Sequence, residues 1–172
     1  GSFPALNLKK EIADIVIPKN DVFVQFDYNG AEIRTLLSLS GQDQPEEDIH
    51  EWNMKNIYTD ITTRPKAKQR FFAWLYNPNS DDHETNKFYN REQILNKFYQ
   101  NGVVSTPFGR EIQSDDFHAL NYLLQSASSD NCLYSAIKIN KFLNEKKSFV
   151  HSVIPDSIII DFSIDERSIL PQ

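Results

Sequence analysis

The segment that most constrains the fold of this chain is residues 26–34. It overlaps a mostly apolar run, residues 22–26, which predicts a buried strand that ends at Asp27. A carboxylate in that position is costly unless it has a partner, often a metal ion. Asp156 stands in a second such context, just before the apolar residues 158–160. Two aspartates at two strand ends predict one shared cation site, and the alternative is that both are ordinary turn residues.

The composition limits the protein class. The chain has 172 residues, enough for one domain or two small lobes on one core. No apolar run is long enough to cross a membrane, no signal peptide is visible, and the first two residues resemble a tag scar. The one cysteine, Cys132, favours a reducing, cytoplasmic location and excludes a cysteine-rich zinc site. The net charge of −6 argues only weakly against nucleic acid.

Periodicity and turn signals predict an α+β fold, in which an antiparallel sheet is backed by helices. Strands are expected at 22–27, 149–154 and 157–162, with a hairpin at 103–112. Helices are expected at 4–17, 31–40, 49–58, 64–77, 90–99 and 115–147, and a polar loop at 79–86. Asp48 should cap the third of these helices. The last helix should bury an apolar stripe made of Phe117, Leu120, Leu124, Ala127, Leu133, Ile137 and Leu143.

One predicted helix carries a cationic and aromatic face. Arg64, Lys68, Phe72 and Tyr76 recur at steps of four, which places them on the same side of the helix. A triphosphate would find positive charge at the first two residues, and a base could stack on the last two. The alternative is a solvated basic turn followed by core aromatics, although neighbouring apolar residues already provide a buried face.

Taken together, these motifs resemble the polymerase module of family A DNA polymerases, the DNA polymerase I-like family, in the style of its short phage-type members. Residues 27–34 resemble the first palm motif, 64–76 the fingers-helix motif, and 155–157 the third motif. The segment 48–50 is similar to the one whose histidine contacts nucleotide phosphate. Asn121 and Gln125 resemble the pair that faces the minor groove, and residues 106–110 resemble the hairpin before it.

The resemblance implies a template-directed DNA polymerase core, with palm at 3–45 and 101–172 and reduced fingers at 46–100. Asp27 and Asp156 would bind two Mg²⁺ ions, or Mn²⁺, with the backbone carbonyl of Tyr28 as a further ligand. Lys68 would bind the triphosphate and protonate the pyrophosphate. The other implied contacts are to nucleotide, through His50, Arg64, Phe72, Tyr76 and Glu32, and to primer-template DNA, through Asn121, Gln125 and Arg110.

Several features depart from the family pattern. Pro155 stands where His is usual, and Ser157 where Glu is usual. A thumb and an exonuclease domain do not fit, so the resemblance implies a palm–fingers fragment that needs other portions of its polypeptide and alone extends primers poorly. If the chain is phage-encoded, its location would be the host cytoplasm.

Two alternatives remain, a catalytically impaired module that binds DNA or a partner, and a metal-dependent phosphodiesterase. Arg34 is either functional or part of a structural ion pair. We predict carboxyl oxygens of Asp27 and Asp156 within roughly 6 Å of each other.

Overall fold

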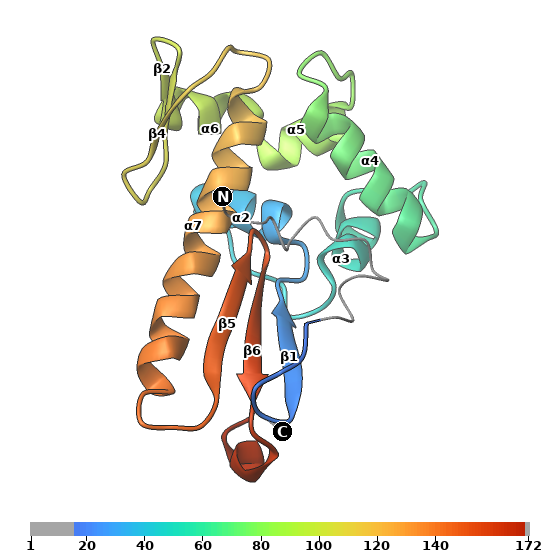
Figure 1. The fold of residues 1–172 in the computed structure, drawn as a ribbon. Coiled ribbons are helices and arrows are strands. Elements are labelled where there is room, and N and C mark those ends of the chain that lie inside the picture. The colour runs from blue at the N-terminus through green and yellow to red at the C-terminus, as the bar shows by residue number, and fades with distance from the viewer. Residues whose placement is uncertain (1–15, 171–172) are drawn as a thin grey trace. The chain divides into compact units, whose positions relative to one another are not determined.

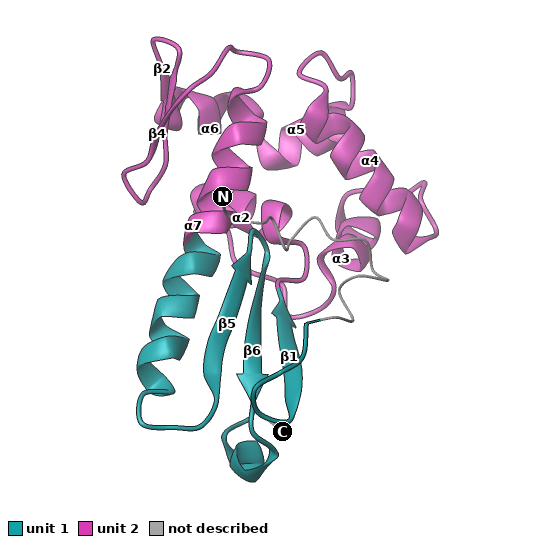
Figure 2. Cartoon of the chain, in the orientation of Figure 1, with its two compact units in different colours: residues 1–27, 131–172 teal, residues 28–130 magenta. Residues whose placement is uncertain are grey.

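The computed structural model describes residues 16–170. The helix expected at 4–17 therefore lies almost wholly outside the described residues. The chain divides into two compact units, shown in Figure 2. Residues 1–27 and 131–172 form one, here called the sheet unit, and residues 28–130 form the other, here called the helical unit. Each unit contains a three-stranded antiparallel sheet and helices, so the predicted α+β class is confirmed.

The sheet unit is built on strands β1 (Val22–Asp27), β5 (Phe149–Ile154) and β6 (Ser157–Phe162). Their order is β1-β6-β5, so β6 is central, which agrees with its almost wholly buried side chains. The two-residue turn 155–156 joins β5 to β6, as predicted. The second half of helix α7 (Ala119–Phe142) lies along β5 (Figure 1), and a 3-10 helix, η2 (Ile164–Ile169), follows β6.

The helical unit has its own core and its own small sheet. Its helices are α2 (Ala31–Leu39), α3 (Ile49–Asn56), α4 (Arg64–Tyr76), α5 (His83–Tyr89), α6 (Arg91–Phe98) and the first half of α7. Strands β2 (Tyr99–Gln100), β3 (Val103–Ser105) and β4 (Glu111–Gln113) form the sheet. Fully buried side chains of α2, α4, α5 and α7 form one cluster, which includes Leu36, Phe71, Trp74, Tyr89 and Leu123.

Local sequence signals explain two junctions near the predicted site. Gly30, which precedes α2, has φ +68°, and a Cβ there would lie 2.7 Å from the Ile49 side chain. Only glycine combines this left-handed backbone with so close an approach of α3. Asp48 caps α3 as predicted, because its carboxylate accepts hydrogen bonds from the backbone amides of His50 (3.0 Å) and Glu51 (3.1 Å).

Three expectations about helices were wrong. The polar stretch 79–86 contains the start of α5, because Asp82 accepts a hydrogen bond from the Thr85 amide (3.1 Å) and caps a helix there. The last helix is shorter than the expected 115–147. Its predicted stripe is only partly buried, since Phe117, Leu133 and Ile137 are about half exposed. Apolar residues occur all around α7, so spacing alone could not select the buried side.

Candidate functional site

The predicted cation ligands Asp27 and Asp156 lie at the same end of the sheet in the sheet unit. Asp27 is the last residue of β1 and is paired in register with Ser157, the first residue of β6. Asp156 is the residue before Ser157, in the β5–β6 turn. The hydrogen bond from Gln25 Nε2 to Ser157 Oγ (3.2 Å) adds a side-chain link between the two strands. Two residues separated by most of the chain are therefore neighbours on two paired strands.

The chemistry of these two side chains fits a hard cation. Both aspartates are exposed, and in the described part of the chain neither carboxylate has a hydrogen bond or ion pair. Mg²⁺ is commonly held by one or two carboxylates, with the remaining positions filled by water and substrate phosphate. Residues 16–170 contain no group of three or more His, Cys, Asp or Glu side chains able to enclose a metal. Two carboxylates are fewer protein ligands than a closed zinc site requires.

Cys132 on α7 lies close enough to both carboxylates for their charges to affect its thiol. Its side chain is fully buried, and its thiol donates a hydrogen bond to the carbonyl of Ile154, the last residue of β5 (3.5 Å). Burial, and then the negative charges of Asp156 and Asp27, raise the pKa of the Cys132 thiol. No pattern in the sequence connects this cysteine with the two aspartates.

In the helical unit, the predicted cationic and aromatic face of α4 is present. The Phe72 and Tyr76 rings stack with centroids 5.7 Å apart and planes at 15°. The Lys68 ammonium lies 5.8 Å from the centroid of the Phe72 ring. Phe71, Trp74 and Leu75 of the same helix are buried. Phe72 is partly buried and packs against this core, with its ring centroid 5.5 Å from that of Phe71, so the aromatic half of the face adjoins the core.

His50 belongs to the same cluster although it comes from α3. Its ring centroid lies 6.2 Å from that of Phe72 and 6.4 Å from that of Phe71. The imidazole is buried, and its Nδ1 has no hydrogen-bond partner among the described residues. Burial is the main cause that lowers the pKa of His50 to about 4. The negative charge of Asp48 opposes this shift, and the positive charges of Arg64 and Lys68 add to it. At neutral pH the ring is therefore uncharged.

Arg64, at the start of α4, is held by the aspartate that caps α3. One guanidinium nitrogen of Arg64 lies 2.7 Å from Asp48 Oδ2. The hydrogen bond from Arg64 drives the pKa of Asp48 far below its usual value, against the opposing effect of burial. The sequence predicts Asp48 as a helix cap, and its ion pair with Arg64 becomes apparent only when the two helices are placed in space.

The remaining predicted residues of α2 and its flanks lie in the helical unit. Tyr28 directly follows β1, and Glu32 is half-buried in the first turn of α2. Arg34 donates hydrogen bonds to three backbone carbonyls, those of Asn29 (3.0 Å), Pro45 (2.9 Å) and Glu47 (2.9 Å). It thus fastens the loop before α3 through carbonyl contacts, and among residues 16–170 it forms no ion pair.

The predicted DNA contacts lie in the same unit. Asn121 and Gln125 are one turn apart on α7, where Gln125 is exposed and the side-chain carbonyl of Asn121 is buried without a partner among the described residues. Arg110 is half exposed and forms an ion pair with Asp130, a buried residue of α7.

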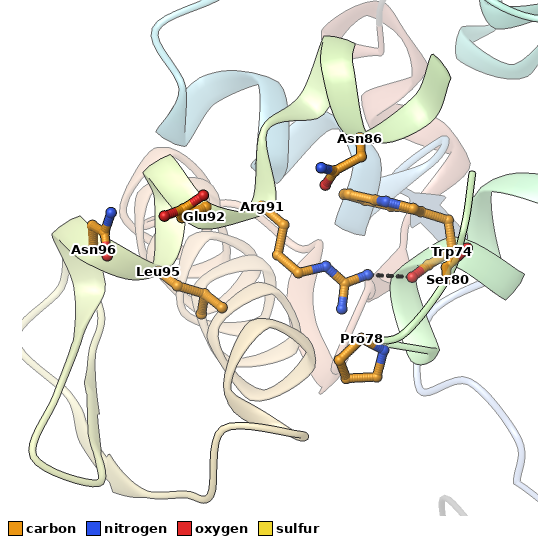
Figure 3. A pocket seen from close by; sticks show the side chains of 8 residues that line it. All are labelled: Trp74, Pro78, Ser80, Asn86, Arg91, Glu92, Leu95 and Asn96. Carbon is orange, nitrogen blue, oxygen red and sulfur yellow. Dashed lines mark hydrogen bonds between the residues drawn. The ribbon is translucent and has the colours of Figure 1, made fainter. Parts of the chain in front are cut away.

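A pocket of about 330 Å³ is lined by residues of α4, of the loop that follows it, of α5 and of α6 (Figure 3). It contains none of the predicted site residues. The guanidinium of Arg91 lies 4.7 Å from the centroid of the Trp74 ring and donates a hydrogen bond to the Trp74 carbonyl. This cation therefore stabilises the last turn of α4.

Comparison with solved structures shows a polymerase-like fold. No protein-family model and no curated protein matches the chain. A structural match is the POL domain of Pol1 from M. smegmatis, solved in complex with DNA primer-template and dNTP. The TM-score is 0.62 at 16% sequence identity, and the match covers 87% of this chain and 35% of that one. The chain thus spans about a third of the polymerase chain that it matches. No described helix is long and apolar enough to cross a bilayer.

Proposed function

We propose that this chain is the core of a template-directed DNA polymerase of family A type. It would transfer deoxynucleotides to a primer 3′-hydroxyl by two-metal-ion catalysis. The observation that carries the proposal is the strand register that makes Asp27 a neighbour of the β5–β6 turn containing Asp156. The fold similarity to a DNA polymerase domain supports the same reaction class.

Asp27 and Asp156 would hold the cations, with the backbone carbonyl of Tyr28 as a further ligand. Bound Mg²⁺ would lower the pKa of the primer hydroxyl and neutralise charge on the triphosphate and the leaving pyrophosphate. Strand β1 and the β5–β6 hairpin would keep the two carboxylates at a fixed separation, which a shared pair of ions requires. Their exposure and lack of ion-pair partners among the described residues support this role.

The face of α4 would bind the incoming nucleotide. Lys68 would contact the triphosphate and donate a proton to the pyrophosphate, and Arg64 would bind the outer oxygens. His50 would donate a hydrogen bond as a neutral imidazole, since its pKa of about 4 leaves it uncharged at neutral pH. Phe72 would pack on the sugar and base, and Glu32 with Tyr76 would exclude a ribose 2′-hydroxyl.

Primer-template DNA would be bound in part by Gln125, Asn121 and Arg110. Grip on duplex DNA comes largely from phosphate contacts, and Arg110 is already paired with Asp130. We therefore propose that other portions of the same polypeptide, such as a thumb, supply most of the DNA affinity. The match to only a third of a known polymerase chain supports this view.

The test is single-nucleotide addition with the 172-residue chain in excess over a primer-template, in Mg²⁺ and in Mn²⁺. We expect slow addition that requires the metal and is abolished by Asp27→Asn. The control is Asp43→Asn, which removes the same charge from an exposed loop position. Addition that persists in Asp27→Asn would contradict the proposal.

A second candidate is a polymerase-like module that binds DNA or a partner without catalysis. It is favoured by Pro155, which replaces the residue usual in the family beside the aspartate of the β5–β6 turn. In the same assay, DNA binding without addition in either metal would support this candidate. Degradation of the primer in the absence of nucleotides would instead indicate a phosphodiesterase.

A further inference from the structure

One carboxylate contacts two residues that would bind the triphosphate, the backbone of His50 and the guanidinium of Arg64. Asp48 Oδ1 accepts a hydrogen bond from the backbone amide of His50 at 3.0 Å, which fixes the first turn of α3. Asp48 Oδ2 accepts from Arg64 at 2.7 Å and from Asn29 Nδ2 at 3.4 Å. Among the described residues, Asp48 is the partner of the Arg64 guanidinium.

We propose that Asp48 is a positioning residue that sets the affinity of the α4 face for phosphate, because it holds Arg64 and competes with phosphate oxygens for it. This inference rests on the proposed function. A carboxylate offers a guanidinium the same two-oxygen geometry as a phosphate, so the two anions are direct competitors. The carboxylate also repels any phosphate that approaches Lys68 and Arg64 from solvent.

The exposure of the pair allows this exchange. The Arg64 side chain is 42% exposed and that of Asp48 is 18% exposed, so the arginine can turn to a ligand while the aspartate stays in place. Asp48 cannot follow it, since two backbone amides of α3 hold the carboxylate. Asp48 therefore keeps Arg64 oriented beside His50. Its carboxylate also neutralises part of the charge of Arg64 until a phosphate replaces it.

The chain contains a matched control for this arrangement. Asp82 caps α5 as Asp48 caps α3, and it binds Arg70 of α4 at 2.7 and 2.8 Å. Arg70 is less exposed than Arg64 and is also bound by Asp60 and Glu84. Asp82 and Arg70 are not among the residues proposed to bind nucleotide. A variant of Asp82 therefore shows whether loss of a capping charge changes phosphate binding only by altering α4.

The experiment measures binding of inorganic tripolyphosphate to the 172-residue chain by calorimetry in metal-free buffer. Asp48→Asn keeps the helix cap, since Asn is as good an N-cap as Asp, but removes the charge. We expect it to tighten binding about fivefold, the effect of removing one unit-charge repulsion at a solvated site. Asp82→Asn should leave the affinity unchanged. In an Arg64→Gln background, Asp48→Asn should have a much smaller effect, because its main target is gone.

The outcomes separate this inference from the proposed function. If the chain does not bind tripolyphosphate, or if Lys68→Gln binds it as well as the unaltered chain, the assignment of the α4 face is wrong and the inference falls with it. If Lys68→Gln weakens binding but Asp48→Asn does not strengthen it, only the inference is wrong. An equal gain in Asp82→Asn would also overturn it, because the effect would then be general charge.

Discussion

Aspartates at different positions of this chain have different partners, and the partners decide what each side chain can do. Asp27 and Asp156 are exposed and have no ion pair in the described part of the chain, so their oxygens can bind a cation. Asp48 is held by Arg64. Asp161 is buried and accepts hydrogen bonds from the backbone amides of Lys19 (2.6 Å) and Asn20 (2.9 Å).

The buried imidazole of His50 makes folding stability depend on pH. Its pKa is lowered chiefly by burial to about 4, from 6.5 in an unfolded chain. Between these values the unfolded state binds more protons, so folding stability falls as the pH falls from about 6.5 to about 4. We expect a loss of about 1–2 kcal/mol at pH 5 relative to pH 7, measured by urea unfolding. An NMR titration that places the His50 midpoint near 6.5 would contradict this account.

The elements around α4 show how two capping aspartates fasten one helix. Asp48 binds its first residue, and Asp82 binds Arg70 two turns later. The Arg70 guanidinium also lies 4.4 Å from the centroid of the Tyr58 ring, and the Tyr58 hydroxyl accepts from Thr85 (3.0 Å). Helices α3, α4 and α5 are thus connected by polar contacts as well as by the apolar core.

Removing the Arg70 charge should weaken this connection. Arg70→Met keeps the aliphatic stem but leaves the largely buried Asp82 without its cation. We expect the free energy of unfolding to fall by about 2 kcal/mol.

Burial alone would raise the pKa of Asp82, but hydrogen bonds from Arg70 and Thr85 outweigh it and lower the pKa to about 2. Its contribution is therefore complete above about pH 4 and is lost as the pH falls towards 2. In Asp82→Asn, the free energy of unfolding measured in urea should therefore fall less between pH 4 and pH 2 than in the unaltered chain. An equal fall in both proteins would refute the role given to Asp82.

The β5–β6 turn gives a second prediction for an element. Pro155 fixes the backbone φ angle next to Asp156. Strands β5 and β6 pair Ile154 with Ser157 directly beside the turn, and their register shifts only farther away, between Val150 and Ser152. Pro155→Gly should lower stability by about 0.4–1 kcal/mol through the entropy of the unfolded chain. It should also weaken Mn²⁺ binding, because Asp156 becomes less fixed. If Mn²⁺ affinity rises instead, the proline misplaces the carboxylate.

Sequence patterns were sufficient where one local signal dominated. The apolar runs with flanking turns located β1, β5 and β6, and the steps of four located the Lys68 face of α4. They failed at α5, because residues 79–86 have the composition of a loop and only Asp82 marks a helix start. The contacts of Asp48 and Cys132 could not be foreseen, since they join residues distant in sequence.

At the scale of the whole molecule, the apolar core is unevenly divided. The large buried cluster lies wholly within the helical unit. The sheet unit buries few apolar side chains among its described residues, mainly Cys132, Ala136, Leu143, Ile158, Ile160 and Phe162. Less buried apolar surface gives less stabilisation, so the sheet unit should open more readily.

Hydrogen exchange can test this difference. We expect amides of β1 and β5 to exchange faster than those of α2 and the first half of α7. Mn²⁺ should slow exchange in the sheet unit more than in the helical unit, because a ligand stabilises the state that binds it. Equal protection of both units, with or without the metal, would contradict the expectation.

The central claim is that Asp27 and Asp156 act together as one cation site. Titration of the chain with Mn²⁺, followed by the electron paramagnetic resonance signal of the free ion, tests it most directly. We predict that the chain binds Mn²⁺, that Asp27→Asn and Asp156→Asn each weaken binding to the same level as the double variant, and that Asp43→Asn has no effect. Binding that survives in the double variant would contradict the account.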